Sequence, residues 1–220
     1  MLNEKKSKVR SKGILFIVSA PSGAGKTTLC RTAVDFFPDL RHSISYTTRP
    51  PRENEVNDVD YHFITPDVFD RMLKKGEFLE WAEVHGYRYG TSVKDLDSVL
   101  KKGCNVILDI DVQGAKQVKE RTGEFFFRQE EKWSAVFIFI LPPSMKVCKE
   151  RLKNRGKDDK ETIKQRIANA KVEIKESMWY DYVIINDDLN AAFTILKSVI
   201  TAERSKQERM ERLVRKLYSK

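Results

Sequence analysis

The chain has 220 residues, of which 40% are hydrophobic and 33% charged, and a formal net charge of +9, as in an ordinary globular protein with one substantial core. No run approaches the roughly 20 apolar residues of a membrane span, and the first residues lack the apolar segment of a secretory signal, so we expect neither a membrane-spanning nor an exported protein. The three cysteines have neither disulfide-type nor metal-type spacing, which indicates a reducing, cytoplasmic compartment.

The positive charge is concentrated at the two ends of the chain. Residues 1–12 hold five Lys or Arg and one Glu, and residues 203–220 hold seven Lys or Arg and three Glu, which leaves only +1 for the rest. We expect residues 1–12 to form a disordered basic arm. Because the excess charge does not lie across a groove, we expect no specific nucleic-acid partner.

The first motif is a phosphate loop over residues 20–27, which follows an apolar, strand-like run at 14–18 and precedes a helical pattern. Its inner glycines let backbone amides turn around phosphate oxygens, where a Cβ would collide. Lys26 adds a charge for the outer phosphates, and the Thr27 hydroxyl suits Mg²⁺. Ala20 stands where the usual pattern has glycine. The alternative, a chance match in a Gly/Ser turn, does not account for the flanking strand and helix.

Further short apolar runs predict the other strands of a sheet. These runs are residues 43–46, 106–110, 136–141 and 182–185. Helical patterns separate most of them, with starts at Ser92, Ser144 and Asp188 and one over residues 113–121. Strands that alternate with helices predict an α/β fold with a parallel sheet covered on both faces. Ligands bind at the carboxyl ends of such strands, where the phosphate loop and residues 109–111 lie.

Two stretches do not follow this alternation, and a third segment is longer than usual. Residues 47–91 are rich in Pro, Arg, Tyr and Trp and predict a small, partly β insertion, and residues 145–172 are strongly charged with a helical pattern. Each of these two could move relative to the sheet. Residues 122–134 form an unusually long connection between a helix and a strand, and the aromatic residues 125–127 within it suggest no function.

Two aspartates, Asp109 and Asp111, follow the apolar run at 105–108. Asp109 lies beside the phosphate loop and is well placed to hold Mg²⁺, through water. The alternative role for Asp109 is the N-cap of the following helix. Asp111 is a second candidate whose side chain could instead cap that helix.

The insertion carries two candidate ligand-binding features. Arg49 and Arg52 lie on a proline-stiffened loop, where they could bind phosphate bidentately; the alternative is an exposed turn or a polyproline ligand. Glu80 lies between apolar neighbours, where a carboxylate needs a partner. It could accept the paired N–H donors of guanine, which adenine lacks; the alternative is a solvent-facing strand residue.

The charged helical stretch carries three arginines. Arg151 and Arg155 are four residues apart and therefore share one helix face. With Arg166 they could close over ATP and offset charge on the transferring phosphoryl group. The alternative is a solvated, charged helix.

The ordered set of motifs resembles guanylate kinase over about residues 13–190. The motifs are residues 20–27, 45–52, 59–63, 78–86, 89–92, 108–114 and 185–187. The resemblance implies a P-loop NTPase-type parallel sheet with helices on both faces, a small mixed α/β GMP-binding insertion and a helical lid. The implied core is 13–46, 92–144 and 172–220, the GMP-binding subdomain 47–91 and the lid 145–171. The chain departs from the family at Asp58, where glycine is frequent, and at residues 53–54, where Pro-Gly is frequent.

The resemblance also implies site residues at matching positions. ATP would be bound by Ala20, Pro21, Ser22, Gly23, Ala24, Gly25, Lys26, Thr27, Thr28, Asn186 and Asp187. GMP would be bound by Ser45, Arg49, Arg52, Tyr61, Glu80, Tyr89, Thr91 and Asp111. The catalytic residues would be Lys26, Arg49, Arg151, Arg155 and Arg166, and Thr27 and Asp109 would hold Mg²⁺.

The expected activity is reversible transfer of the ATP γ-phosphoryl group to GMP and dGMP, with Mg²⁺, in purine nucleotide metabolism. Because the acceptor is already a phosphate dianion, no strong general base is required. Three other classes stay open: a non-catalytic guanylate-kinase-like module that binds proteins, a kinase of another phosphorylated nucleoside or sugar, and a polyanion-binding protein. Lys26 and Arg151 argue against the module, and the nearly neutral core argues against polyanion binding. The sequence predicts no oligomeric state.

Overall fold

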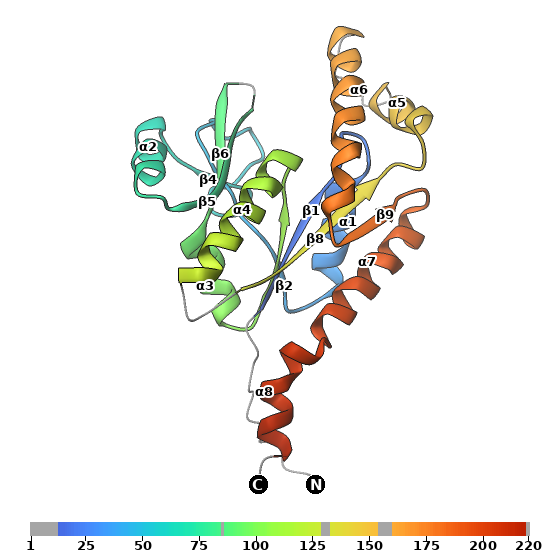
Figure 1. Cartoon of the computed structure of the whole chain (residues 1–220). Coiled ribbons are helices and arrows are strands. Elements are labelled where there is room, and N and C mark those ends of the chain that lie inside the picture. Colours follow the sequence, from blue (N-terminus) through green and yellow to red (C-terminus); the bar gives the residue numbers. More distant parts are fainter. Residues whose placement is uncertain (1–12, 85, 129–132, 154–159, 219–220) are drawn as a thin grey trace.

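The computed structural model describes residues 13–84, 86–128, 133–153 and 160–218 (Figure 1). It is an α/β structure with one five-stranded and one four-stranded sheet, which confirms the predicted fold class. The basic arm predicted for residues 1–12 lies outside the described residues.

The larger sheet is parallel throughout. Its strands are β1 (Ile14–Ser19), β2 (Leu40–His42), β7 (Asn105–Asp109), β8 (Ser134–Leu141) and β9 (Tyr182–Ile185). They lie in the order β2-β7-β1-β8-β9, and every pair of neighbours runs parallel. The central strand β1 is buried along its whole length, as expected of a strand covered on both sides.

The predicted strand at residues 43–46 is wrong. The large sheet instead uses β2, while Tyr46–Thr47 forms strand β3 of the small sheet. β2 lies at the edge of the sheet, so that Leu40 is buried while Arg41 and His42 are exposed. It therefore lacks the apolar run that identifies a fully buried parallel strand.

Helices cover both faces of the large sheet (Figure 1). Helices α1 (Lys26–Phe36) and α7 (Leu189–Arg204) cover one face, and α3 (Val93–Lys101) and α4 (Val112–Arg128) cover the other. Successive side chains of a strand point to opposite faces. Phe16 and Val18 accordingly pack in the cluster with α1 and α7, whereas Leu15 and Ile17 pack in the cluster with α3 and α4.

The predicted starts of three helices are confirmed by their capping hydrogen bonds. Ser92 Oγ accepts from the Asp95 amide at 3.3 Å at the start of α3, and Asp188 Oδ1 accepts from the Ala191 amide at 2.8 Å at the start of α7. Ser144 Oγ accepts from the Val147 amide at 3.2 Å, at the start of α5 (Met145–Lys153). A capped helix start satisfies backbone donors that would otherwise lack partners, which is why these positions could be predicted.

The helix expected to span residues 113–121 is longer than predicted. α4 continues to Arg128, so the connection expected to begin at residue 122 is largely helical. Gly123 weakens a helix by about 1 kcal/mol, but it does not end this one.

The small sheet pairs its strands both parallel and antiparallel, and together with helix α2 it gives the insertion the mixed α/β character that was predicted. Its strands are β3 (Tyr46–Thr47), β4 (His62–Phe63), β5 (Phe78–Val84) and β6 (Tyr87–Ser92), in the order β4-β3-β6-β5. Helix α2 (Pro66–Lys74) packs on it through Phe69, whose ring stacks on Phe78 with centroids 4.4 Å apart. Asp58 has φ +64°, a left-handed conformation that glycine adopts more easily.

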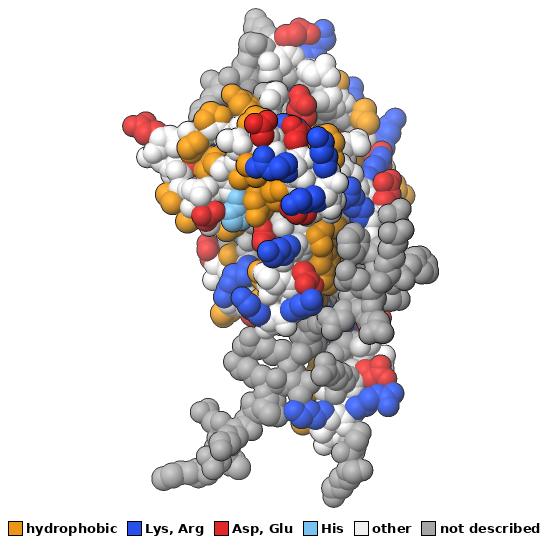
Figure 2. Space-filling model, turned by 90° about the vertical axis from the view of Figure 1, so that its left-hand side faces the viewer, with side chains coloured by type: hydrophobic (Ala, Val, Ile, Leu, Met, Phe, Trp, Pro, Cys, Tyr) orange, Lys and Arg blue, Asp and Glu red, His pale blue; other side chains and the backbone are white. Residues whose placement is uncertain are grey.

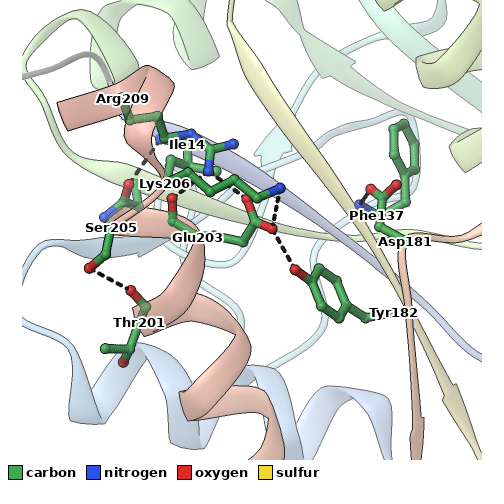
Figure 3. Close-up of polar contacts among 10 residues, drawn as sticks. Ile14, Phe137, Asp181, Tyr182, Thr201, Glu203, Ser205, Lys206 and Arg209 are labelled. Atoms are coloured by element: carbon green, nitrogen blue, oxygen red, sulfur yellow. Dashed lines mark hydrogen bonds and ion pairs between the residues drawn. The ribbon is translucent and has the colours of Figure 1, made fainter. Parts of the chain in front are cut away.

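The remaining helices are α6 (Lys160–Lys175), the 3-10 helix η1 (Glu176–Trp179) and α8 (Gln207–Tyr218). α8 extends away from the sheets and is tied to the core by Glu203 (Figures 1 and 3). Glu203 is 1% exposed, lies 2.7 Å from Lys206 and 2.5 Å from Arg209, and accepts a hydrogen bond from Tyr182 at 2.6 Å. This buried carboxylate is therefore paired, as burial of a charge requires.

The surface carries mixed charge on the face drawn in Figure 2. Basic and acidic side chains are interspersed there between smaller apolar patches. Among the described helices, none combines the length and the hydropathy needed to cross a bilayer.

Candidate active site

The phosphate loop connects β1 to α1 at the carboxyl end of the central strand. Gly23 and Gly25 both have φ +87°, a conformation that side chains other than that of glycine rarely adopt. A Cβ on Gly25 would lie 2.4 Å from Asn186 Nδ2, and that amide nitrogen donates to the Ala24 carbonyl at 2.7 Å. Asn186 follows β9 directly and is buried, and its hydrogen bond therefore stabilises the conformation of the loop.

Lys26, Thr27 and Asp109 converge beside this loop. Lys26 Nζ lies 2.5 Å from Asp109 Oδ1 and donates to the Ile110 carbonyl at 2.8 Å. Thr27 Oγ1 donates to Asp109 Oδ2 at 3.3 Å. The first turn of α1 and the end of β7 thus bring together a cation, a hydroxyl and a carboxylate.

The donors at this point suit Mg²⁺. Thr27 and Asp109 offer the hard oxygen ligands that Mg²⁺ takes in proteins. Within the described part of the chain, no group of three or more His, Cys, Asp or Glu is placed to hold a metal ion. A site with so few protein ligands fits an ion whose other ligands are waters and substrate phosphates.

Glu80 lies on β5 and is only 5% exposed, so the alternative of a solvent-facing residue is wrong. The Thr91 hydroxyl donates to Glu80 Oε1 at 2.5 Å. Burial is the main cause that raises the pKa of Glu80, to about 7 in all; the Thr91 hydrogen bond lowers this pKa and the charge of Asp111 raises it. Gly114 makes room for this carboxylate, because a Cβ there would lie 2.9 Å from Oε2.

Asp111 caps α4. Its Oδ1 accepts from the Gly114 amide at 2.8 Å, which is the alternative that the sequence left open. The cap also places the Asp111 carboxylate close enough to Glu80 to act on its pKa. The structure therefore groups Glu80, Thr91 and Asp111, three of the residues predicted to recognise guanine.

The proline-stiffened loop that carries Arg49 and Arg52, here called the arginine loop, is held in place by a residue that the sequence analysis missed. Arg49 Nη2 lies 2.8 Å from Glu55 Oε1, and the Arg52 amide donates to Glu55 Oε2 at 2.8 Å. The Arg49 guanidinium also lies over the Tyr61 ring, 5.5 Å from its centroid, and Tyr61 in turn meets Tyr89 with centroids 6.0 Å apart. The Arg49 side chain is 11% exposed, which excludes a simple exposed turn.

One cleft of about 680 Å³ joins the phosphate loop to the insertion. Lys26, Thr27 and Asp109 line it from the large-sheet side. Ser45, Arg52, Glu55 and Tyr61 line it from the other side, together with Arg31, Asp35 and His42, which the sequence analysis did not single out. Of the predicted GMP-binding residues, Ser45, Arg52 and Tyr61 line this cleft with Lys26 and Thr27, whereas Arg49, Glu80, Tyr89, Thr91 and Asp111 are not among its lining residues.

A second cavity of about 400 Å³ is lined in part by the phosphate loop. Gly25, Thr28, Arg151 and Asp187 are among the residues that line it. Arg151 donates to the carbonyls of Asn186 and Asp187 at 3.1 and 3.4 Å, so it does not belong to a merely solvated helix.

The other two predicted lid arginines are placed differently. Arg166 lies on α6 and is partly buried. Arg155 lies outside the described residues.

Comparisons with known proteins agree on one family. Residues 12–203 match the family model described as guanylate kinase. The chain is 51% identical to a guanylate kinase of Geobacter metallireducens over 92% of this chain and 95% of that one, and 49% identical to one of Geobacter sulfurreducens over 96% and 99%. The crystal structure of guanylate kinase from Anaplasma phagocytophilum superposes with a TM-score of 0.70 at 30% identity, covering 94% of this chain and 95% of that one. The chain belongs to the guanylate kinase family.

Proposed function

We propose that the chain transfers the γ-phosphoryl group of ATP, bound with Mg²⁺, to GMP in the cleft between the phosphate loop and the arginine loop. The observation that carries this proposal is the shared cleft, which Lys26 and Thr27 line on one side and Ser45, Arg52 and Tyr61 on the other. Two anionic substrates held there would meet with their phosphates facing each other, which is what in-line transfer requires.

The ATP half of the site would use the loop of residues 20–25, the start of α1 and Lys26. Backbone amides and the positive end of a helix favour phosphate. Thr27 and Asp109 would hold Mg²⁺, which when bound offsets charge on the phosphates. Asn186 and Asp187 would line the nucleoside end, as their place in the second cavity supports.

In the GMP half of the site, one set of residues would bind the phosphate and another set would bind the base. Arg49, Arg52, Tyr61 and Tyr89 would bind the phosphate, since guanidinium groups grip phosphate oxygens in pairs. Ser45, Glu80, Thr91 and Asp111 would bind guanine, with Glu80 accepting from the adjacent N–H groups of the base. None of these proposed contacts involves the ribose 2′ hydroxyl, so we include dGMP as an acceptor.

Catalysis would consist of positioning and charge neutralisation. The acceptor phosphate is already anionic, so the chain needs cations more than a base. Lys26 and Arg49 would hold the two phosphates, and Arg151, Arg155 and Arg166 would be brought in by the lid, residues 145–171. Closure of the lid and of the insertion, residues 47–91, would keep water from the γ-phosphate. All three cysteines are unpaired, which supports a cytoplasmic location for this reaction.

Measuring ADP formation from ATP and Mg²⁺ with GMP, dGMP, AMP, CMP and UMP as acceptors tests the proposal. We expect turnover with the guanine nucleotides alone. Equal use of AMP would contradict the role given to Glu80, and the absence of acceptor-dependent turnover would contradict the reaction itself.

A further inference from the structure

The edge strand β5 of the small sheet is held by side chains of α4. β5 is the last strand in the order β4-β3-β6-β5, so β6 pairs with only one of its two sides. An edge strand presents backbone N–H and C=O groups that need partners. The Arg121 guanidinium donates to the Phe78 carbonyl, and Gln117, one turn earlier on α4, binds the backbone of Trp81. A helix that covers the large sheet therefore supplies partners for β5 where a further strand is lacking.

Gln117 binds Trp81 through both ends of its side-chain amide. The Trp81 N–H donates to Gln117 Oε1 at 3.1 Å, and Gln117 Nε2 donates to the Trp81 carbonyl at 2.8 Å. Because two hydrogen bonds join the same two residues, they fix the orientation of β5 on α4 as well as its distance. The contact joins the insertion to the helix that begins just after Asp111.

Glu80, the acid proposed to bind guanine, directly precedes Trp81. Gly114 lies three residues before Gln117 and therefore on the same face of α4. That face makes room for the acid, because a Cβ on Gly114 would lie 2.9 Å from Glu80 Oε2. The Thr91 hydroxyl on β6 donates to the other oxygen, Oε1, at 2.5 Å. The carboxylate is thus located between β6 and the α4 face to which Gln117 fixes β5.

The register of β5 shifts just before this acid. Phe78 pairs with Ser92 and Glu80 pairs with Thr91, so the irregularity falls at Leu79. The Leu79 side chain is buried in the core cluster that α3 and α4 cover. Because a bulge changes the direction of the side chains beside it, the position of Glu80 depends on the two α4 contacts that hold β5 on either side of the bulge.

We propose that Gln117 is a positioning residue, which fixes β5 on α4 through the Trp81 backbone and so holds the Glu80 carboxylate in place for guanine. The inference deepens the proposed function and rests on it, because it needs Glu80 to bind the base. It adds a residue that has no proposed contact with either substrate and whose contribution to GMP binding passes through Glu80.

Steady-state kinetics of Q117M in the full chain test the proposal. Methionine keeps the length of the side chain but makes neither hydrogen bond, and Arg121 still binds β5, so we expect the fold to be retained. KM for GMP should rise about tenfold, since two hydrogen bonds between neutral groups are lost, while KM for ATP stays unchanged. The matched control is Q207M, the same replacement at an exposed position of α8, which should behave as the wild type.

Q117N is a milder variant that carries the test if Q117M does not fold. Its side chain is one methylene shorter, so the amide can no longer reach both backbone groups of Trp81. We expect an intermediate rise in KM for GMP. Wild-type KM for GMP in either folded variant would overturn the proposal, as would an equal rise in KM for GMP and for ATP.

The pH dependence of KM for GMP separates positioning from a general loss of structure. Burial is the main cause that raises the pKa of Glu80, and the charge of Asp111 also raises it. A hydrogen-bond donor and two cations lower it, namely Thr91, Arg121 and Lys26. A β5 released from Gln117 lets water reach the carboxylate, so in Q117M the rise in KM for GMP on acidification should begin at a lower pH than in the wild type. An unshifted profile would overturn the proposal.

A double-mutant cycle with E80Q tests whether Gln117 acts through Glu80. We expect Q117M to raise KM for GMP much less in the E80Q background, because the carboxylate that Gln117 positions is already gone. Independent, multiplying effects would overturn the proposal, and wild-type KM for GMP in E80Q would overturn it through the role of Glu80. Failure of the proposed function would show separately, as a wild-type chain that does not phosphorylate GMP.

Discussion

The ammonium group of Lys26 lies 2.5 Å from the carboxylate of Asp109, which joins the first turn of α1 to the end of β7. Both residues line the cleft that leads to the arginine loop. A cation for phosphate and a carboxylate for Mg²⁺ are thus held together at the carboxyl end of the sheet, where ligands of open α/β folds bind.

Replacement of Lys26 by alanine should reduce kcat by about 100-fold or more, because a charge aimed at the transferring phosphoryl group is lost in a site built for charge neutralisation. Circular dichroism should show unchanged helix content. Lys94→Ala, on the exposed face of α3, is the control and should keep wild-type kinetics. Wild-type kcat in Lys26→Ala would contradict the assignment of the loop.

Affinity for GMP should depend on pH through Glu80. The raised pKa of about 7 means that the carboxylate becomes protonated as pH falls below neutrality. A protonated acid can no longer accept from both N–H groups of guanine, so KM for GMP should rise by up to about tenfold per pH unit below 7. KM for ATP is the internal control. In Glu80→Gln we expect a higher KM for GMP that no longer varies with pH.

Glu80 should also shape the pH dependence of stability. Its pKa is 4.5 in the reference state and about 7 in the folded chain, so between these values the folded chain binds more protons. The contribution of Glu80 to the free energy of unfolding is therefore greatest below pH 4.5 and falls as pH rises towards 7. Thermal unfolding of Glu80→Gln across this range should lack that decline, and above pH 7 its Tm should exceed that of the wild type. Parallel curves for the two proteins would contradict this expectation.

Replacement of Glu55 should weaken the binding of GMP and leave the binding of ATP unchanged. Glu55 binds the Arg49 guanidinium and the Arg52 amide, so Glu55→Ala releases the arginine loop from its ordered form. We expect KM for GMP to rise by about fivefold to tenfold, the cost of losing one or two hydrogen bonds that involve a charged group. Glu53→Ala, two residues away and exposed, is the control. An equal change in both variants would mean that Glu55 has no specific role.

Two glycines with positive φ provide a matched test of the phosphate loop. Gly25→Ala places a Cβ 2.4 Å from Asn186 Nδ2, whereas Gly76→Ala meets nothing within 4 Å. Both substitutions strain the backbone by about 1 kcal/mol, but only the first displaces the residue that braces the loop. We expect ATP affinity, measured by calorimetry, to fall in Gly25→Ala and to stay unchanged in Gly76→Ala.

The sequence predicted the parts of the fold that are buried on both sides or capped. β1 and β8 carry apolar runs because helices cover both of their faces, and Ser92, Ser144 and Asp188 mark helix starts because orphan backbone donors need acceptors. The edge strand β2 escaped prediction because only Leu40 of it is buried. The other edge strand, β9, was predicted because its four residues are all apolar, although only Ile184 is buried.

The residues of the site also fall into two groups, those that a local motif identified and those that the sequence analysis did not assign. Local motifs identified the phosphate loop and placed Asp109 beside it, because those residues follow strands directly. Asn186 escaped assignment to the role described above because it acts on backbone brought to it by the fold. Glu55 contacts residues only three and six positions away, but it lies outside the motifs at 45–52 and 59–63. Asn186 reaches Ala24 across 162 residues of chain, a relationship that no local pattern encodes.

The most direct test of the account uses a single compound in which adenosine and guanosine are joined by five phosphates. If one cleft holds both substrates with their phosphates facing, this compound should compete with ATP and with GMP and should bind about 100-fold more tightly than GMP, since linking two ligands makes the second binding step intramolecular. Competition with only one substrate, at an affinity no better than that of GMP, would contradict the shared cleft.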